Sequence, residues 1–100
     1  KILIALGMFQ ALADVYPDNI GSRLSILRNT LVTADEFIQS DHHVVPRWQP
    51  GDSRVRYPKI KIGDQASLWT YLDWMLSASS NAAASMVMRE LVLMTRFSRC

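Results

Sequence analysis

LWTYLDWMLSASSNAAASMVMREL, residues 68–91, decides the fold of this chain. Its first part carries apolar side chains at the spacing of an amphipathic helix, namely Leu68, Tyr71, Leu72, Met75 and Leu76. A polar break at 79–81 follows, and three alanines then open a second helix that we expect to run to about Phe97. Ser67 suits the N-cap of the first helix, and either Ser80 or Asn81 suits that of the second. The stretch predicts two packed helices joined by a tight corner.

The amino-terminal stretch, 1–15, also predicts a helix. It lacks proline, and its apolar positions Ile2, Leu3, Leu6, Phe9 and Ala13 fit helical spacing. Further apolar residues fill much of the remaining surface, so we expect burial on most sides, as in the central helix of a larger body. A signal peptide is the competing interpretation, with Lys1 as its charged end and 11–13 as its cleavage site. The helix-compatible continuation to Tyr16 favours the helix.

The middle of the chain is mixed. Leu24, Leu27, Leu31 and Val32 predict a short amphipathic helix within 22–37, and Thr33 with Glu36 matches a capping box that favours a helical turn at 34–39. Residues 41–62 predict a hairpin-like excursion. In it, 49–52 (Gln-Pro-Gly-Asp) fits a type II turn, and Pro58 suits an edge strand.

Composition excludes several classes of protein. With 100 residues, 49% of them hydrophobic and 20% charged, the chain is typical of a globular protein rather than a disordered one. A net charge of +2 is too small to indicate a nucleic-acid partner. The single cysteine, Cys100, excludes an internal disulfide and a cysteine-based zinc site. His42 and His43, with Asp41, Asp35 and Glu36 as further candidate ligands, match no established zinc spacing, and we expect a polar loop there instead.

The corner carries the best functional candidate, Ser79-x-Asn81. Placed after an amphipathic helix and before a small-residue helix, it resembles the Ser-x-Asn motif of the class A β-lactamases and penicillin-binding proteins. Lys1, at the head of an apolar helix, then matches the lysine of the family's Ser-x-x-Lys motif. On this interpretation the chain begins three residues after its own nucleophile. The resemblance covers 1–15 and about 68–91.

This resemblance implies an α+β family fold, of which 1–100 is one mainly helical segment with 41–62 as an insertion. It implies acyl transfer through an acyl-serine on a small-molecule or peptide substrate containing an amide or ester. No cofactor is needed. Lys1 serves as the base for the nucleophile, Ser79 passes a proton towards the leaving nitrogen, and Asn81 holds the substrate amide and orients the lysine. A periplasmic, secreted or cell-envelope location follows, as does packing against the rest of the same domain.

Two residues depart from the family pattern. Ser80 stands where β-lactamases commonly carry aspartate, which favours the penicillin-binding proteins or unclassified relatives, and Ser85 stands where class A enzymes usually have a second asparagine. The family's Lys-Thr/Ser-Gly element is absent and is expected beyond Cys100. No residue matches the deacylating glutamate, so hydrolase and transpeptidase both remain open.

The alternative is a non-catalytic helical module that binds a partner. Trp48 and Tyr57 lie among the basic residues of the excursion, a composition that suits nucleic acid or an anionic glycan; these basic residues are Arg47, Arg54, Arg56, Lys59 and Lys61. Charges that protect a sheet edge from pairing explain the same pattern, and we favour that interpretation. Trp69 and Trp74 lie off the apolar stripe of their helix and offer a second candidate surface.

Overall fold

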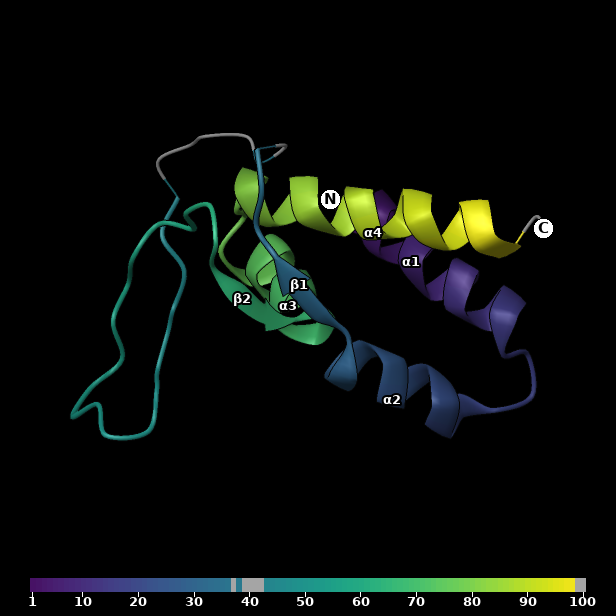
Figure 1. Cartoon of the computed structure of the whole chain (residues 1–100), viewed down its shortest axis with the longest axis horizontal. Helices are drawn as coiled ribbons and strands as arrows, with labels where there is room; N and C mark the ends of the chain where they lie inside the picture. The colour runs from purple at the N-terminus through teal and green to yellow at the C-terminus, as the bar shows by residue number, and fades with distance from the viewer. Residues whose placement is uncertain (37, 39–42, 99–100) are drawn as a thin grey trace.

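The computed structural model describes residues 1–36, 38 and 43–98, with side chains described as far as residue 94. Its helices are α1 (Ile2–Val15), α2 (Ile20–Asn29), α3 (Leu68–Ser77) and α4 (Asn81–Ser98), and its strands are β1 (Leu31–Thr33) and β2 (Gln65–Ser67). The described part of the chain is therefore a small, mostly helical α+β structure. Figure 1 shows α1 and α4 side by side, with α3 and the two strands beside them and α2 at one edge.

Helix α1 has two different faces. Its inner face buries Ala5, Met8 and Leu12, and Gly7 lets the helix approach α4 closely, since an added Cβ would lie 3.2 Å from Leu91 Cδ2. Its outer face is open, and Leu3 is the most exposed of its large hydrophobic residues at 82%. The expectation that this helix is buried on most sides is wrong for the described chain, because α4 and α3 cover one face only. The helix ends where the Tyr16 N–H donates to Leu12 O ahead of Pro17.

The segment after α1 was only partly predictable. Helix α2 forms, capped by the Asn19 carboxamide, which accepts a 3.0 Å bond from Ser22 N–H, and it buries Leu27. The helix ends at Asn29, and Leu31 and Val32 belong to β1 instead. The predicted capping box is wrong, since Thr33 pairs with Gln65 in the sheet. The predicted turn at 34–39 lies partly outside the described residues.

The two strands pair antiparallel, with Leu31 opposite Ser67 and Thr33 opposite Gln65. Their pairing brings the end of α2 to the start of α3, where Leu68 N–H donates to Thr30 O at 2.9 Å. Ser67 then caps α3 as predicted, its Oγ accepting from Thr70 N–H at 3.1 Å. The sheet therefore fixes the origin of the helix that ends at the polar corner.

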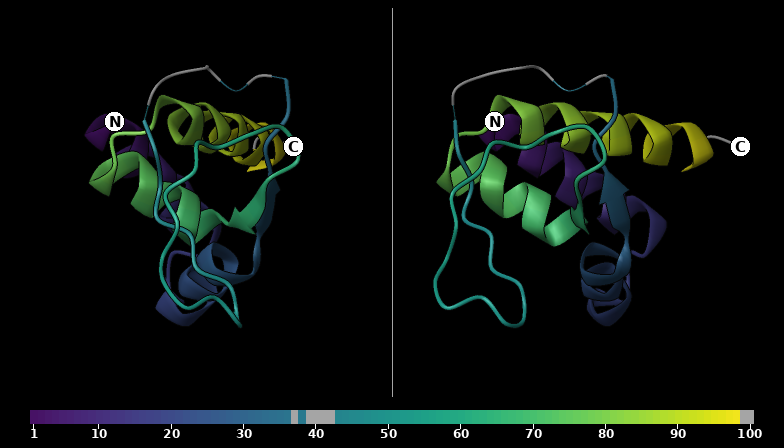
Figure 2. Two further views of the ribbon diagram at one scale, coloured as in Figure 1. Left: turned by 90° about the vertical axis from the view of Figure 1, so that its left-hand side faces the viewer. Right: turned by 60° about the vertical axis from the view of Figure 1, so that its left-hand side comes forward.

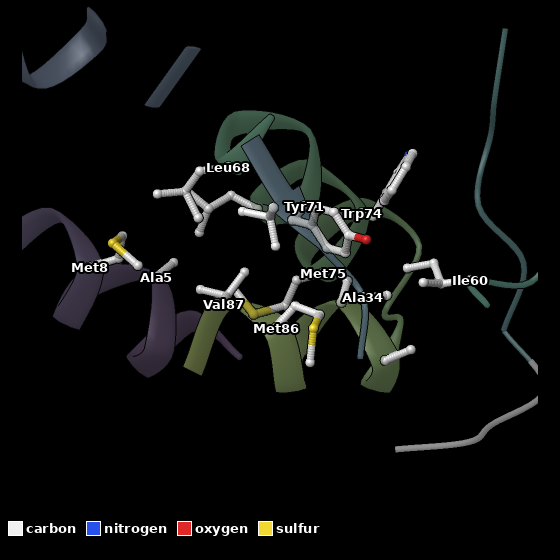
Figure 3. Packing of buried hydrophobic residues seen from close by; sticks show 14 of the residues in the cluster. Ala5, Met8, Ala34, Ile60, Leu68, Tyr71, Trp74, Met75, Met86 and Val87 are labelled. Atoms are coloured by element: carbon white, nitrogen blue, oxygen red, sulfur yellow. The ribbon is translucent and has the colours of Figure 1, made fainter. Parts of the chain in front are cut away.

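One hydrophobic cluster holds the helices together (Figure 3). From α3, Tyr71 and Met75 are fully buried, and from α4 Met86 and Val87 meet them. Tyr71 also donates its hydroxyl to Asp64 O at 2.9 Å, and burial, with the charge of Asp64 adding, raises its pKa to about 12. A buried phenol of this kind needs its partner, because an unpaired hydroxyl in an apolar core is costly.

The excursion projects at its tip beyond the helices (Figures 1 and 2), whereas its Val45 and Ile60 are buried in the core. Its tip has the features of the predicted type II turn: Asp52 N–H donates to Gln49 O at 2.9 Å, and Gly51 has a φ of +100°. The two arms share one isolated bridge, between Arg47 and Arg56. Pro58 has no N–H to extend the ladder, although its carbonyl accepts from Val45 N–H at 2.9 Å. Residues 41 and 42 of the predicted insertion lie outside the described residues.

Candidate active site

Two of the three predicted site residues, Lys1 and Ser79, lie in contact in the structure. Lys1 is the N-cap residue of α1, and its Nζ donates a hydrogen bond to the backbone carbonyl of Ser79, 78 positions along the chain. Lys1 and Ser79 are both exposed, so the contact lies at the surface, where the start of α1 passes the end of α3. The side-chain ammonium group of Lys1 and the backbone of the polar corner therefore meet at one place on the surface.

Ser79 turns the chain sharply. Ala78 ends α3 in helical geometry, and Ser79 follows with a φ of +56°, in the left-handed region that only a minority of non-glycine residues adopt. The N–H groups of Ala78 and Ser80 both donate to Trp74 O, at 3.1 and 3.3 Å, which closes the end of the helix. This geometry reverses the chain within three residues, so that α4 packs back against α3.

Of the two candidate caps for α4, the structure uses Ser80. Its Oγ accepts from Ala83 N–H at 3.1 Å, and the residue is 1% exposed. Asn81 is the first residue of α4 and half-buried, and its carbonyl accepts from Ser85 Oγ at 3.0 Å. The middle serine of the motif thus has a structural role, while Ser79 before it is exposed.

A pocket of about 380 Å³ lies at this corner. Its lining joins the start of α1 to the end of α3: Lys1, Ile2, Leu3, Met75, Leu76 and Ser79. A smaller pocket of about 170 Å³ continues along the same side and shares Leu76, with Phe9, Trp69, Leu72 and Asp73 around it. The larger pocket can hold a small molecule with one polar end near the lysine and an apolar body against the helices.

Sequence reasoning missed the apolar wall of this pocket. Leu76 was assigned to the core stripe of its helix, but it is 45% exposed and lies between the two pockets. Helical periodicity identifies an apolar face but cannot show where the neighbouring element stops covering it.

The two tryptophans of α3 behave differently. Trp69 is 48% exposed, whereas Trp74 is 3% exposed, so its assignment to an exposed surface is wrong. The excursion covers Trp74: its Nε1 donates to Pro46 O at 3.1 Å, and the Arg47 guanidinium lies 5.3 Å from the ring centroid. The tryptophan part of the alternative function therefore depends on Trp48 and Trp69.

Metal binding gains no support in the part of the chain that the structure describes, where no group of three or more His, Cys, Asp or Glu residues gathers. Of the histidine pair considered above, His42 lies outside the described residues, as does Asp41. Comparison of the chain with protein-family models, with curated proteins and with solved structures gives no match. The geometry of the corner is therefore the basis for any functional argument.

Proposed function

We propose that this chain is the helical lobe of a serine acyl-transfer enzyme that resembles the β-lactamases and penicillin-binding proteins. The single observation that carries the proposal is the hydrogen bond from Lys1 Nζ to the carbonyl of Ser79. Lys1 and Ser79 belong to two separate motifs that each resemble a motif of this family, and helical periodicity alone gives no reason for these residues to lie together. The pocket beside it supplies room for a substrate.

The proposed reaction begins with a serine three positions before Lys1 in the parent protein. Its hydroxyl attacks an amide or ester carbonyl, and the side chain of Lys1 serves as the base that accepts the proton, because serine alone is a weak nucleophile. The acyl–oxygen bond forms, and the bond to the leaving group breaks. Ser79 passes the proton to the leaving nitrogen or oxygen. Asn81 holds the substrate amide through its carboxamide and orients the lysine.

The exposed apolar side chains of α1 support the proposal that this helix packs against the rest of the same domain. Ile2, Leu3, Leu6 and Phe9 are 46–82% exposed on one face of the helix. Large contiguous apolar surfaces are uncommon on isolated soluble domains and usually mark a surface that another part covers. The proposed enzyme places its antiparallel sheet and its Lys-Thr/Ser-Gly element there. A location in the periplasm or cell envelope, or secretion, belongs to the same proposal.

The test uses the full-length product of the gene that encodes this chain. We expect a fluorescent penicillin or a fluorophosphonate to form a covalent adduct, mapped by peptide mass spectrometry to the serine before Lys1. Lys1→Ala and Ser79→Ala should each slow adduct formation by roughly 10²–10⁴-fold, the usual contribution of a proton-transfer group. Ser77→Ala is the matched control, because Ser77 is exposed near the same corner and donates to Asp73 O of its own helix.

Two results contradict the proposal. One is the absence of an adduct with both reagents in a folded full-length protein. The other is an adduct that forms equally fast in the Lys1→Ala variant, since a nucleophile that needs no lysine belongs to a different mechanism. Circular dichroism of each variant shows whether a slow rate reflects unfolding instead.

A further inference from the structure

The excursion has two faces of different character. Antiparallel pairing of Arg47 with Arg56, together with the bond from Val45 N–H to Pro58 O, sets the register of its two arms. Alternate residues of an extended chain point to opposite sides. One side therefore carries Val45 and Ile60, which are 0% and 7% exposed and join the core. We call this the inner face.

By this alternation the outer face carries the remaining residues, and all of them are exposed; Pro46 and Trp48 also border a pocket beside Thr70 and Trp74. On the first arm they are Val44, Pro46 and Trp48, and on the second they are Val55, Tyr57, Lys59 and Lys61. Trp48 is 58% exposed and Tyr57 63%. The outer face therefore combines two aromatic rings and two branched aliphatic side chains with two lysines, on a segment that projects from the body (Figures 1 and 2).

Two described acidic residues, Asp52 within the excursion and Asp64 just after it, do not offset this charge at the outer face. Asp52 Oδ2 accepts from Gln49 N–H at 3.0 Å and lies 3.6 Å from Arg56 Nε. Asp64 Oδ2 accepts from Lys61 N–H at 2.9 Å and lies 3.9 Å from an Arg47 nitrogen. Both carboxylates are thus engaged with inner-face arginines and backbone. In the described chain, the ammonium groups of Lys59 and Lys61 form no ion pair.

Protection of a sheet edge does not account for this pattern. The arms share a single isolated bridge, so they present no long strand edge that a neighbouring molecule could extend. Edge protection also gives no reason for exposed aromatic and aliphatic side chains, which promote association. The outer face needs a partner that accepts rings, branched aliphatics and cations together.

We infer that the outer face of the excursion docks the protein on an anionic lipid membrane surface. Tryptophan and tyrosine favour the membrane–water interface, where the ring enters the apolar boundary and the polar atom stays hydrated. Lysines bury their methylene stems there and keep the ammonium among the anionic head groups. Arginines suit bidentate phosphate recognition in nucleic acid, but Arg47 and Arg56 belong to the inner face and lie 3.9 and 3.6 Å from the carboxylates of Asp64 and Asp52. This inference is independent of the proposed acyl-transfer chemistry.

No helix in the described residues is both long and apolar enough to cross a bilayer. Surface docking needs no such helix, because interfacial residues and electrostatic attraction suffice for reversible binding. Each basic residue near an anionic surface contributes about 1 kcal/mol, equivalent to roughly fivefold in affinity. The two outer lysines together should therefore account for about 25-fold.

The experiment measures co-sedimentation of the chain with vesicles of phosphatidylcholine containing phosphatidylglycerol, and with vesicles of phosphatidylcholine alone. We expect binding to the anionic vesicles, weakened about fivefold by Lys59→Gln and less than about twofold by the control Arg28→Gln. Arg28 is an exposed cation of α2, so the control removes the same charge from another surface. Tyr57→Ser should weaken binding as well, since it removes an exposed ring.

Brominated lipids then report which tryptophan enters the membrane. In a Trp69→Phe background, quenching is expected at Trp48, whereas in a Trp48→Phe background it should largely disappear. Quenching that follows Trp69 instead would assign binding to the apolar face of α1 and α3 and overturn the inference. Equal binding to neutral vesicles, or equal effects of Lys59→Gln and Arg28→Gln, would overturn it too. Tighter binding to single-stranded DNA than to the vesicles would identify a nucleic-acid surface in its place.

Discussion

Replacing Ser80 by alanine tests how the corner between α3 and α4 is held. Ser80 is 1% exposed, and its Oγ accepts a 3.1 Å hydrogen bond from Ala83 N–H. The first backbone N–H groups of a helix have no partner within the helix, so this donor depends on the serine. In the Ser80→Ala variant, water cannot easily replace the lost acceptor because the site is shut off from solvent.

The expected loss follows from two effects. Removing a side-chain N-cap typically costs about 1 kcal/mol, and leaving a buried donor without a partner costs about 1–3 kcal/mol. Both figures describe the loss of the same hydrogen bond, at an exposed and at a buried cap, so they are not added. We expect Ser80→Ala to lower the free energy of unfolding by about 2 kcal/mol. In a domain of this size each 1 kcal/mol lowers Tm by about 4–8 °C, which gives a fall of about 8–16 °C.

The assay is urea and thermal unfolding followed by far-ultraviolet circular dichroism. Ser77→Ala and Ser79→Ala are the controls, since both serines are exposed and neither caps α4. Each should change the free energy of unfolding by no more than about 0.5 kcal/mol, as surface substitutions usually do. A loss below about 0.5 kcal/mol for Ser80→Ala, with an unchanged urea dependence, would show that the cap does not hold the corner.

Three further substitutions probe the core. Trp74→Phe removes the donor to Pro46 O and part of a buried ring, and urea unfolding should show a loss of about 1–2 kcal/mol. Met8→Ala, at 0% exposure, should cost about 2–5 kcal/mol in the same assay, and a smaller loss would show that α1 is loosely packed. Burial raises the pKa of Tyr71 to about 12, so the unfolded state loses its phenolic proton first as pH rises. Stability should therefore fall by roughly 2 kcal/mol between about pH 10 and 12, and Tyr71→Phe, which lacks the phenol, should remove this part of the decline.

The helices were predictable because their signals are local. The stripe of α3, its cap at Ser67 and the end of α1 before Pro17 each depend on residues within a few positions of one another. The type II turn at 49–52 is local as well. Physical effects that act within one or two turns of chain leave a pattern that a single sequence displays.

The paired strands were not predictable in this way. Leu31–Thr33 pairs with Gln65–Ser67 across more than thirty residues, and three residues are too few to show a period of two. Leu31 is 61% exposed beside a fully buried Val32, which helical spacing had placed on one face. The different exposure of Trp69 and Trp74 also depends on residues that are distant in the sequence. Only the folded path of the excursion decides which ring is covered, and no local signal encodes that path.

The candidate site was proposed from a resemblance, and the structure adds one feature that periodicity could not predict, the backbone geometry of Ser79. Ser79 is the one non-glycine residue with positive φ in the described chain, a conformation that costs of order 1 kcal/mol. Glycine would adopt it without that cost but would offer no hydroxyl. Ser80 offsets the cost by capping α4 next to it. The corner therefore keeps an exposed hydroxyl beside the pocket, in a position where folding alone would favour glycine, and strain retained in this way is typical of functional sites.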